Sequence, residues 1–198
     1  SILSRKLETY PIEAIVRGYI VGSGWKTYQK SGEICGIPLE PGLQFAEKFP
    51  EPLFTPTTKE DDGHDENITF REMIDRVGKE DAEKIRDLSI NLYEKARDFA
   101  AEKGVIIADT KFEFGKDQDG NIILIDEIFT PDSSRFWKKA DYQPGKEPAA
   151  YDKQYVRNYL SNSDWDKNSP PPELPQDVIN NTRAKYLEIF EVLTGTQL

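Results

Sequence analysis

The segment from Ile107 to Glu127 constrains the fold more than any other part of the chain. Two runs rich in β-branched, aromatic and charged residues, 107–115 and 121–127, flank the pair Asp119-Gly120. An Asp-Gly pair favours a type I′ turn, because both central residues of that turn take positive φ. We therefore predict a β-hairpin with a two-residue loop at this pair.

The predicted turn decides which residues face each other across the hairpin. Glu113 lies six residues before Asp119, and Asp126 lies six residues after Gly120. They would be directly opposed, with Cα atoms ~4.5–5.5 Å apart. Two carboxylates this close repel each other unless a proton or a cation lies between them. Mg²⁺ carrying nucleotide phosphates suits an all-oxygen site, so we predict that Glu113 and Asp126 are metal ligands.

Two alternatives to this metal site remain open at this stage. A bulge or a longer loop would change the register of the hairpin. Acidic residues at the ends of a hairpin can also be ordinary solvated side chains.

The first strand of the hairpin is predicted to carry charged side chains on one face. Asp109, Lys111 and Glu113 alternate with Phe112 and Phe114, so the charged and aromatic side chains lie on opposite faces. At ~3.3 Å per residue, Asp109 and Glu113 are ~13 Å apart and do not bind one ion together. We expect them to contact different parts of a long ligand.

Three motifs resemble the SAICAR synthetase family, the phosphoribosylaminoimidazole-succinocarboxamide synthases. Residues 109–115, Asp-Thr-Lys-Phe-Glu-Phe-Gly, resemble the second signature of that family. Residues 10–23, Tyr-Pro-Ile-Glu-Ala-Ile-Val-Arg-Gly-Tyr-Ile-Val-Gly-Ser, resemble the first signature, and residues 126–137 match a third block. The resemblance covers essentially the whole chain, and the segments between the motifs are most like those of fungal members.

The resemblance implies an α+β fold, with an antiparallel sheet flanked by helices. This fold is the larger lobe of a two-lobed, kinase-like architecture, and we expect residues 1–198 to form it as a single domain. Family members begin with a further N-terminal lobe, which carries lysines and a glycine-rich loop for the ATP phosphates. The first signature follows Ser1 closely, so we expect that lobe to be absent from these residues and to be their partner. Neither G-x-x-x-x-G-K-[ST] nor G-x-G-x-x-G occurs in the sequence.

The resemblance also implies a reaction of purine biosynthesis. A carboxylated aminoimidazole ribotide (CAIR) is joined to L-aspartate, with ATP and Mg²⁺ as cofactors and an acyl phosphate as intermediate. Lys111 and Asp109 are the implied catalytic residues. Lys111 would neutralise charge between phosphate and carboxylate, and Asp109 would contact the substrate and orient an amine.

Three residues are assigned by the resemblance to the 5′-phosphate of the ribotide: Arg17, Ser23 and Arg135. A guanidinium fork and a hydroxyl are suited to a phosphate monoester, because the fork forms two charge-assisted hydrogen bonds. Without the resemblance, Arg17 would be interpreted as a surface ion-pair residue.

Four further residues are assigned to substrate binding. Asp132 would contact the imidazole amine or the ribose, and the resemblance places Glu13, Asp65 and Lys59 near the active site. Taken alone, Asp132 could equally cap a turn, and Asp65 beside His64 is typical of a solvated loop.

Two other classes of function are weighed against the ligase. A different kinase-like phosphotransferase is less well supported, because the sequence contains no His-Arg-Asp triplet and no Asp-Phe-Gly. A non-catalytic nucleotide-binding module is disfavoured by the joint presence of Arg17, Ser23, Lys111, Glu113, Asp126 and Arg135.

Composition excludes several other roles. The net charge of −10 argues against nucleic acid and membrane surfaces as partners, since both bind basic patches. Cys35 is the sole cysteine, which fits the reducing cytoplasm. The sequence has no apolar run near 18 residues, so it predicts no transmembrane span.

Periodicity predicts the remaining elements. Helices are expected from a capping box at Thr69 and Glu72 to about Val77, and over 79–103, 151–161 and 176–194. Residues 10–22 are expected to be extended strand. Residues 31–58 are rich in glycine and proline and are expected to form loop, and residues 138–150 to be irregular.

Overall fold

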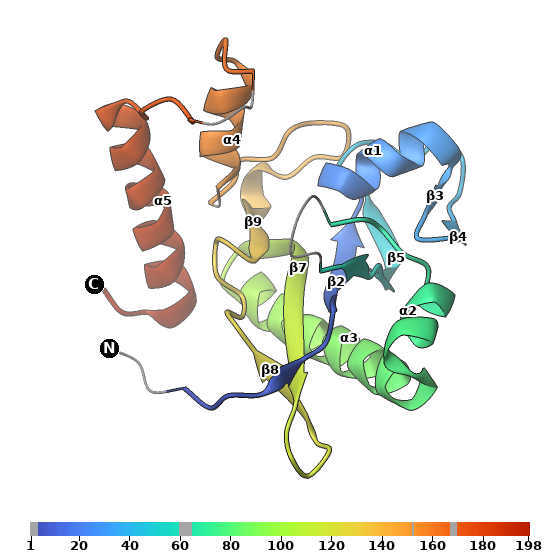
Figure 1. Ribbon diagram of the computed structural model, residues 1–198. Helices are drawn as coiled ribbons and strands as arrows, with labels where there is room; N and C mark the ends of the chain where they lie inside the picture. The colour runs from blue at the N-terminus through green and yellow to red at the C-terminus, as the bar shows by residue number, and fades with distance from the viewer. Residues whose placement is uncertain (1–3, 60–64, 152, 167–169) are drawn as a thin grey trace.

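An antiparallel sheet forms the centre of the computed structural model, which describes residues 4–59, 65–151, 153–166 and 170–198 (Figure 1). The strands of the sheet are β1 (Glu8–Thr9), β2 (Ile12–Tyr19), β5 (Lys48–Phe54), β6 (Thr57–Thr58), β7 (Val105–Lys116), β8 (Ile122–Ile125) and β9 (Ser134–Lys138). A separate ribbon consists of β3 (Glu33–Ile34) and β4 (Ile37–Pro38). The helices are α1 (Gly22–Ser31), α2 (Phe70–Val77), α3 (Lys79–Glu102), α4 (Gln154–Ser161), α5 (Gln176–Thr194) and the 3₁₀-helix η1 (Lys139–Asp141). The predicted α+β architecture, an antiparallel sheet flanked by helices, is confirmed.

The long strand β7 organises the sheet. β1 and β2 pair with one of its edges, and β8 and β9 pair with the other. β5 and β6 extend the sheet from β2. Between β8 and β9 the chain leaves this second edge of β7. It returns to the edge at Ser133, whose carbonyl accepts a hydrogen bond from the Lys111 amide (2.9 Å). The segment 126–133 is therefore held beside the middle of β7.

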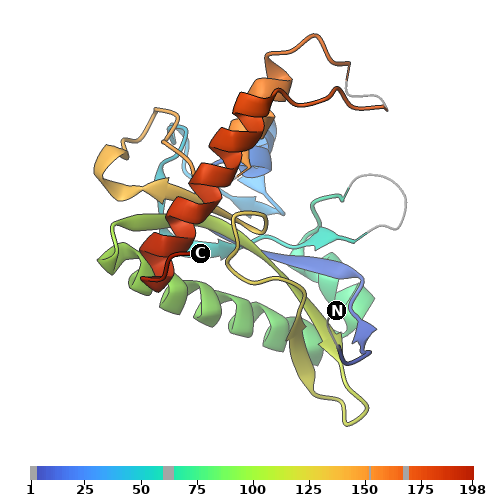
Figure 2. The ribbon, with the colours of Figure 1, turned by 90° about the vertical axis from the view of Figure 1, so that its left-hand side faces the viewer.

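The two faces of the sheet have different environments (Figure 2). α3 runs along one face and buries the main apolar core against it, with Ala14, Val16, Phe112, Phe114, Ile85 and Tyr93 among its residues. α1 and α4 lie on the other side. That side carries a smaller core, which includes Tyr19, Ala108 and Trp137, and the polar residues described below. The predicted separation of Phe112 and Phe114 from the charged residues of β7 is confirmed.

The hairpin forms as predicted, but its loop has a different length. Gly120 donates its N–H to the Asp117 carbonyl (3.1 Å) and takes a φ of 82°, which is typical of a three-residue loop with a G1 bulge. The ladder pairs Glu113 with Ile125. The predicted two-residue loop is therefore wrong, and so is the direct opposition of Glu113 and Asp126. Asp126 lies just beyond the ladder, with a φ of 61°.

The glycine- and proline-rich segment 31–58 is more structured than expected. It contains the β3–β4 ribbon and the strand β5. Pro50 and Pro52 lie within β5, and they are tolerated because β5 is an edge strand, paired on one side with β2. The extended stretch predicted for 10–22 ends at Tyr19, and the helix α1 begins at Gly22.

The helices predicted from periodicity are confirmed. Thr69 and Glu72 form a reciprocal capping box at the start of α2. Gly104, just after α3, and Gly195, which caps α5, take the left-handed conformation expected at helix ends. In the described ranges, no helix is long and apolar enough to cross a membrane.

Candidate functional site

A β-bulge in β7 lies at the centre of the site. Between Ile107 and Thr110, β7 contains one residue more than the paired segment of β9, so Ala108 and Asp109 both lie opposite Arg135. Bulges of this kind redirect side chains and are frequent beside functional sites. Because of the bulge, Ala108 and Asp109 both lie on the face that carries α1 and α4, with Ala108 in the smaller core and Asp109 at the polar cavity described below.

Asp109 joins two arginines that are distant in sequence. Its Oδ2 atom accepts from Arg17 Nη1 (3.0 Å) and from Arg135 Nη1 (2.6 Å). Arg17 Nη2 donates to Ser23 Oγ (3.0 Å), and Arg17 Nε donates to Thr55 Oγ1 (3.0 Å). Arg17 is 2% exposed. Burial lowers the pKa of Arg17, and Asp109 opposes that effect; the guanidinium stays charged because its reference pKa is so high.

The N-terminus of α1 lies beside these arginines. Gly22 takes a φ of 60°, and a Cβ atom added there would be 2.5 Å from Arg135 Nη2. No side chain caps this end of α1. The first N–H groups of a helix lack partners within the helix and attract anions. Ser23 therefore lies where two guanidinium groups and a positive helix end meet.

A second cluster of charged side chains lies next to the first and is centred on β2 and β7. Lys111 Nζ bonds Glu13 Oε1 (2.9 Å) and Glu113 Oε1 (2.7 Å), and Lys59 pairs with the other oxygen of Glu113. Burial alone would lower the pKa of Lys111, but hydrogen bonds with Glu113 and Glu13 outweigh it and raise that pKa. Burial favours a higher pKa for Glu113, yet both lysines together lower it. Lys111 and Glu113 are therefore both ionised near neutral pH.

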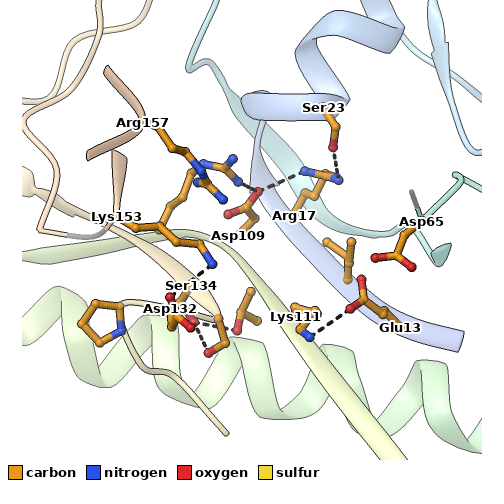
Figure 3. Close-up of a pocket in the computed structure, with 15 residues that line it drawn as sticks. Glu13, Arg17, Ser23, Asp65, Asp109, Lys111, Asp132, Ser134, Lys153 and Arg157 are labelled. Atoms are coloured by element: carbon orange, nitrogen blue, oxygen red, sulfur yellow. Dashed lines mark hydrogen bonds and ion pairs between the residues drawn. The ribbon is translucent and has the colours of Figure 1, made fainter. Parts of the chain in front are cut away.

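The two clusters open into one cavity of about 330 Å³ (Figure 3). The predicted site residues that line it are Glu13, Arg17, Ser23, Asp65, Asp109, Lys111, Asp132 and Arg135. They come from β2, α1, β7, β9 and the two connecting segments that contain Asp65 and Asp132. The predicted convergence of Arg17, Ser23 and Arg135 is confirmed.

Three predicted residues lie outside the lining of this cavity. Lys59 and Glu113 are linked to it through Lys111, while Asp126 is exposed at the end of β8. Among the residues that the structure describes, no cluster of three or more His, Cys, Asp or Glu side chains is arranged to hold a metal ion. His64, singled out beside Asp65, falls outside the described residues.

Two cationic residues at the cavity were missed from the sequence. Lys153 is the N-cap residue of α4 and forms an ion pair with Asp132 (3.2 Å), and Arg157 lies one turn later, within α4. Their spacing of four residues places both on one helix face. That spacing is the signal that the sequence offers for them.

The chain matches known proteins along almost its full length. The family model described as SAICAR synthetase matches residues 1–172. A phosphoribosylaminoimidazole-succinocarboxamide synthase from Xanthomonas axonopodis pv. citri (strain 306) is 55% identical, with 98% of this chain and 63% of that protein covered. A second, from Geotalea uraniireducens (strain Rf4), is 54% identical, with 98% and 66% covered.

Solved structures show the same similarity. A SAICAR synthase from Saccharomyces cerevisiae, complexed with SAICAR, superposes with a TM-score of 0.88 at 46% identity, covering 98% of this chain and 63% of that one. A SAICAR synthetase in complex with ADP gives a TM-score of 0.71 at 29% identity, with 98% and 66% covered. The identity to these bacterial relatives exceeds that to the yeast protein, so the likeness is not restricted to fungal members. The chain spans about 63% of the length of the first relatives that it matches.

Proposed function

The chain belongs to the SAICAR synthetase family, and we propose that it forms the ribotide-binding domain of an ATP-dependent ligase joining CAIR to L-aspartate. One observation carries the proposal: Asp109 bridges Arg17 and Arg135 beside Ser23 and the N-terminus of α1. Two guanidinium groups, a hydroxyl and a helix N-terminus are suited to a phosphate monoester.

The phosphate of the ribotide would enter this arrangement as a dianion. Arg17 and Arg135 supply two guanidinium groups, and the helix end supplies backbone N–H groups. Asp109 repels an anion at close range, but it fixes both guanidinium groups before the ligand arrives. A preorganised site loses less side-chain entropy on binding. The yeast relative, described as complexed with SAICAR, supports this assignment.

The carboxylate end of the ribotide would lie toward Lys111. A carboxylate does not acylate an amine at neutral pH, so we propose that it takes the γ-phosphoryl group of ATP and becomes an acyl phosphate. The amine of aspartate then attacks the acyl carbon, and phosphate leaves. Lys111 is held protonated by Glu13 and Glu113, so it can neutralise charge on the phosphate and the carboxylate in the transition state.

Lys153 and Arg157 provide cations at the cavity that the ribotide phosphate does not need. L-Aspartate brings two carboxylates, and we propose that these two residues bind them. Asp132 pairs with Lys153 in this structure, so its carboxylate can hold that ammonium or orient an amine. Asp65 lines the cavity on the side opposite Lys153, and we propose that it contacts the substrates there (Figure 3).

Glu113 and Asp126 are proposed to hold the Mg²⁺ that accompanies ATP. Their oxygens suit this ion, which usually takes one or two protein carboxylates and completes its shell with water and phosphates. Bound there, the ion would neutralise the nucleotide phosphates. Glu113 is paired with Lys59 and Lys111 in this structure. Those two ammonium groups would turn toward the phosphates when a nucleotide binds.

The remaining ATP contacts are assigned to the part of the relatives that this chain does not cover. The chain spans 63% of the Xanthomonas protein, and its sequence contains no glycine-rich phosphate motif. We propose that the other lobe of the enzyme supplies that loop and closes the nucleotide site. The relative in complex with ADP supports nucleotide binding by the family.

Calorimetric titration of the 198-residue chain with CAIR tests the proposal. We expect a saturable site, about tenfold or more weakened in Arg135→Ala, because a charge-assisted bidentate contact is lost. Arg183→Ala removes an exposed arginine on α5 and should leave affinity unchanged. A chain that binds MgATP but no CAIR would instead support another kinase-like phosphotransferase.

A further inference from the structure

Each of the three guanidinium nitrogens of Arg17 donates a hydrogen bond to another side chain, and one of these three partners lies outside the cavity. Asp109 and Ser23 hold its two Nη atoms and line the cavity themselves. Thr55 holds the Nε atom from behind (3.0 Å) and has no exposed surface. We propose that Thr55 is a positioning residue for the phosphate site and acts through the guanidinium of Arg17.

The local backbone fixes the direction of the Thr55 hydroxyl. Thr55 lies between β5 and β6, where its N–H donates to the Ile15 carbonyl (2.8 Å). Its hydroxyl donates to the same carbonyl (3.4 Å). A hydroxyl has a single proton and two lone pairs. Because the proton points to Ile15, a lone pair is left to accept from Arg17 Nε.

An acceptor at Nε controls the orientation of the whole guanidinium. This group is planar, so fixing Nε–H in one direction fixes the plane that contains both Nη atoms. The plane seen here directs Nη1 to Asp109 and Nη2 to Ser23. Without Thr55, the group could rotate about its last side-chain bonds, and the fork would lose its alignment.

The three anchors differ in what happens when an anion arrives. A phosphate in the cavity competes for the Nη protons and for the Ser23 hydroxyl, since both face the cavity. Thr55 does not line the cavity, so the ligand cannot displace it from Nε. Of the three contacts, the one to Thr55 therefore persists in the free and the bound states and preorganises the site.

The test uses a pair of ligands that differ only in the phosphate, and this inference rests on the proposed function. The 198-residue chain is titrated with CAIR and with the corresponding ribonucleoside, which lacks the 5′-phosphate. Thr55→Val keeps the shape of the side chain but leaves a buried N–H without an acceptor. We expect CAIR affinity to fall about tenfold and ribonucleoside affinity to stay unchanged. Thr55→Ser, which retains the hydroxyl, should restore CAIR binding.

Thr182→Val is the matched control. It removes a hydroxyl that donates to the Val178 carbonyl (2.7 Å) within α5, away from the cavity. We expect it to bind both ligands as the unsubstituted chain does. Thermal unfolding of each variant identifies the temperature range in which all of them are folded, and titrations are carried out within it.

The outcomes separate this inference from the function on which it rests. If Thr55→Val weakens both ligands equally, Thr55 has a merely structural role and the inference is wrong. Unchanged CAIR binding also refutes it, while the proposed function stands. Should the unsubstituted chain bind CAIR no more tightly than the ribonucleoside, both are wrong.

A second measurement covers a Thr55→Val chain that does not fold. The Nε–H proton of Arg17 in the unsubstituted chain can be followed by nuclear magnetic resonance. Bonded to Thr55 and buried, it should exchange with water much more slowly than the Nε–H of an exposed arginine such as Arg183. Exchange as fast as that of Arg183 would overturn the inference.

Discussion

Asp109 uses one carboxylate oxygen to hold two guanidinium groups, and this contact determines the chemistry of the cavity. With Arg17 almost fully buried, the pair of arginines is aligned by protein contacts before any ligand is bound. A buried ion pair of this kind contributes specificity of geometry more dependably than it contributes stability. Residues that fix these arginines therefore matter as much as residues that touch the ligand.

Gly22 provides a direct test of this view. A methyl group at Gly22 would collide with Arg135 Nη2, whereas Gly32, at the other end of α1, has an equally left-handed backbone and no neighbour within 4 Å. Both Gly→Ala variants should lose about 1 kcal/mol of stability from backbone strain. Gly22→Ala alone should weaken CAIR binding, measured by calorimetry, because Arg135 must move. Equal affinities in the two variants would contradict the role given to Arg135.

Cys35 provides a prediction of pH dependence. Burial raises the pKa of its thiol to about 11, compared with ~8.5 for a free thiol. The folded state therefore favours the protonated thiol. The contribution of this thiol to the free energy of unfolding is fully present below pH ~8.5 and is lost as the pH rises from that value toward about 11. The rate of alkylation by iodoacetamide should still rise tenfold per pH unit between pH 8.5 and 10. A plateau near pH 9 would show that the thiol is exposed.

At the scale of elements, the face on which a side chain lies could be predicted from the sequence, but the register of the β7–β8 hairpin could not. Alternation alone predicts Phe112 and Phe114 on one face of the strand and Lys111 on the other, and the structure agrees. The turn was wrong because a glycine with positive φ serves a type I′ turn and a G1 bulge equally well. One extra loop residue moves the partner of Glu113 from Asp126 to Ile125.

The bulge at Asp109 could not be predicted for a related reason. A bulge depends on the partner strand β9, which is distant in sequence, and nothing in residues 107–110 marks it. The convergence of Arg17 with Arg135 was predicted from the family resemblance, not from spacing. Arg157 was missed because its place at the cavity depends on how α4 packs, which helical periodicity does not specify.

The loop of the hairpin can be tested by substitution at Gly120. Its φ of 82° is costly for residues with a side chain, so Gly120→Ala should destabilise the chain by about 1 kcal/mol in urea unfolding. Gly120→Asn should cost less, because asparagine tolerates the left-handed region. If alanine and asparagine proved equally harmless, the loop would not have the bulged form seen here.

On the scale of the whole molecule, the charge of the cavity differs from that of the chain. The chain has a net charge of −10. Around the cavity, counted over the part of the chain that the structure describes, Arg17, Lys111, Arg135, Lys153 and Arg157 face four acidic residues. The local excess of positive charge is small, so anion binding depends on the placement of the cations and not on the overall field.

The last prediction concerns what this chain can do by itself. The groups proposed for the ribotide phosphate, Arg17, Ser23 and Arg135, all lie within its 198 residues. The loop proposed for the ATP phosphates does not, and without it the γ-phosphate would be unclamped and an acyl phosphate exposed to water. The purified chain should bind CAIR but ligate it to aspartate at least 100-fold more slowly than a full-length relative. A rate loss on the order of 100-fold is typical when reacting groups are no longer held in position.

The assay for this prediction supplies CAIR, aspartate and MgATP to the chain and, in parallel, to the full-length Xanthomonas relative. Formation of the succinocarboxamide product is followed in both. Comparable turnover would refute the prediction, and it would locate the phosphate-binding elements within this chain, in the charged segment 59–67. Substitution of Lys59, which pairs with Glu113, would then be expected to abolish turnover. Slow turnover with intact CAIR binding would show that the ribotide site forms without the closed nucleotide site.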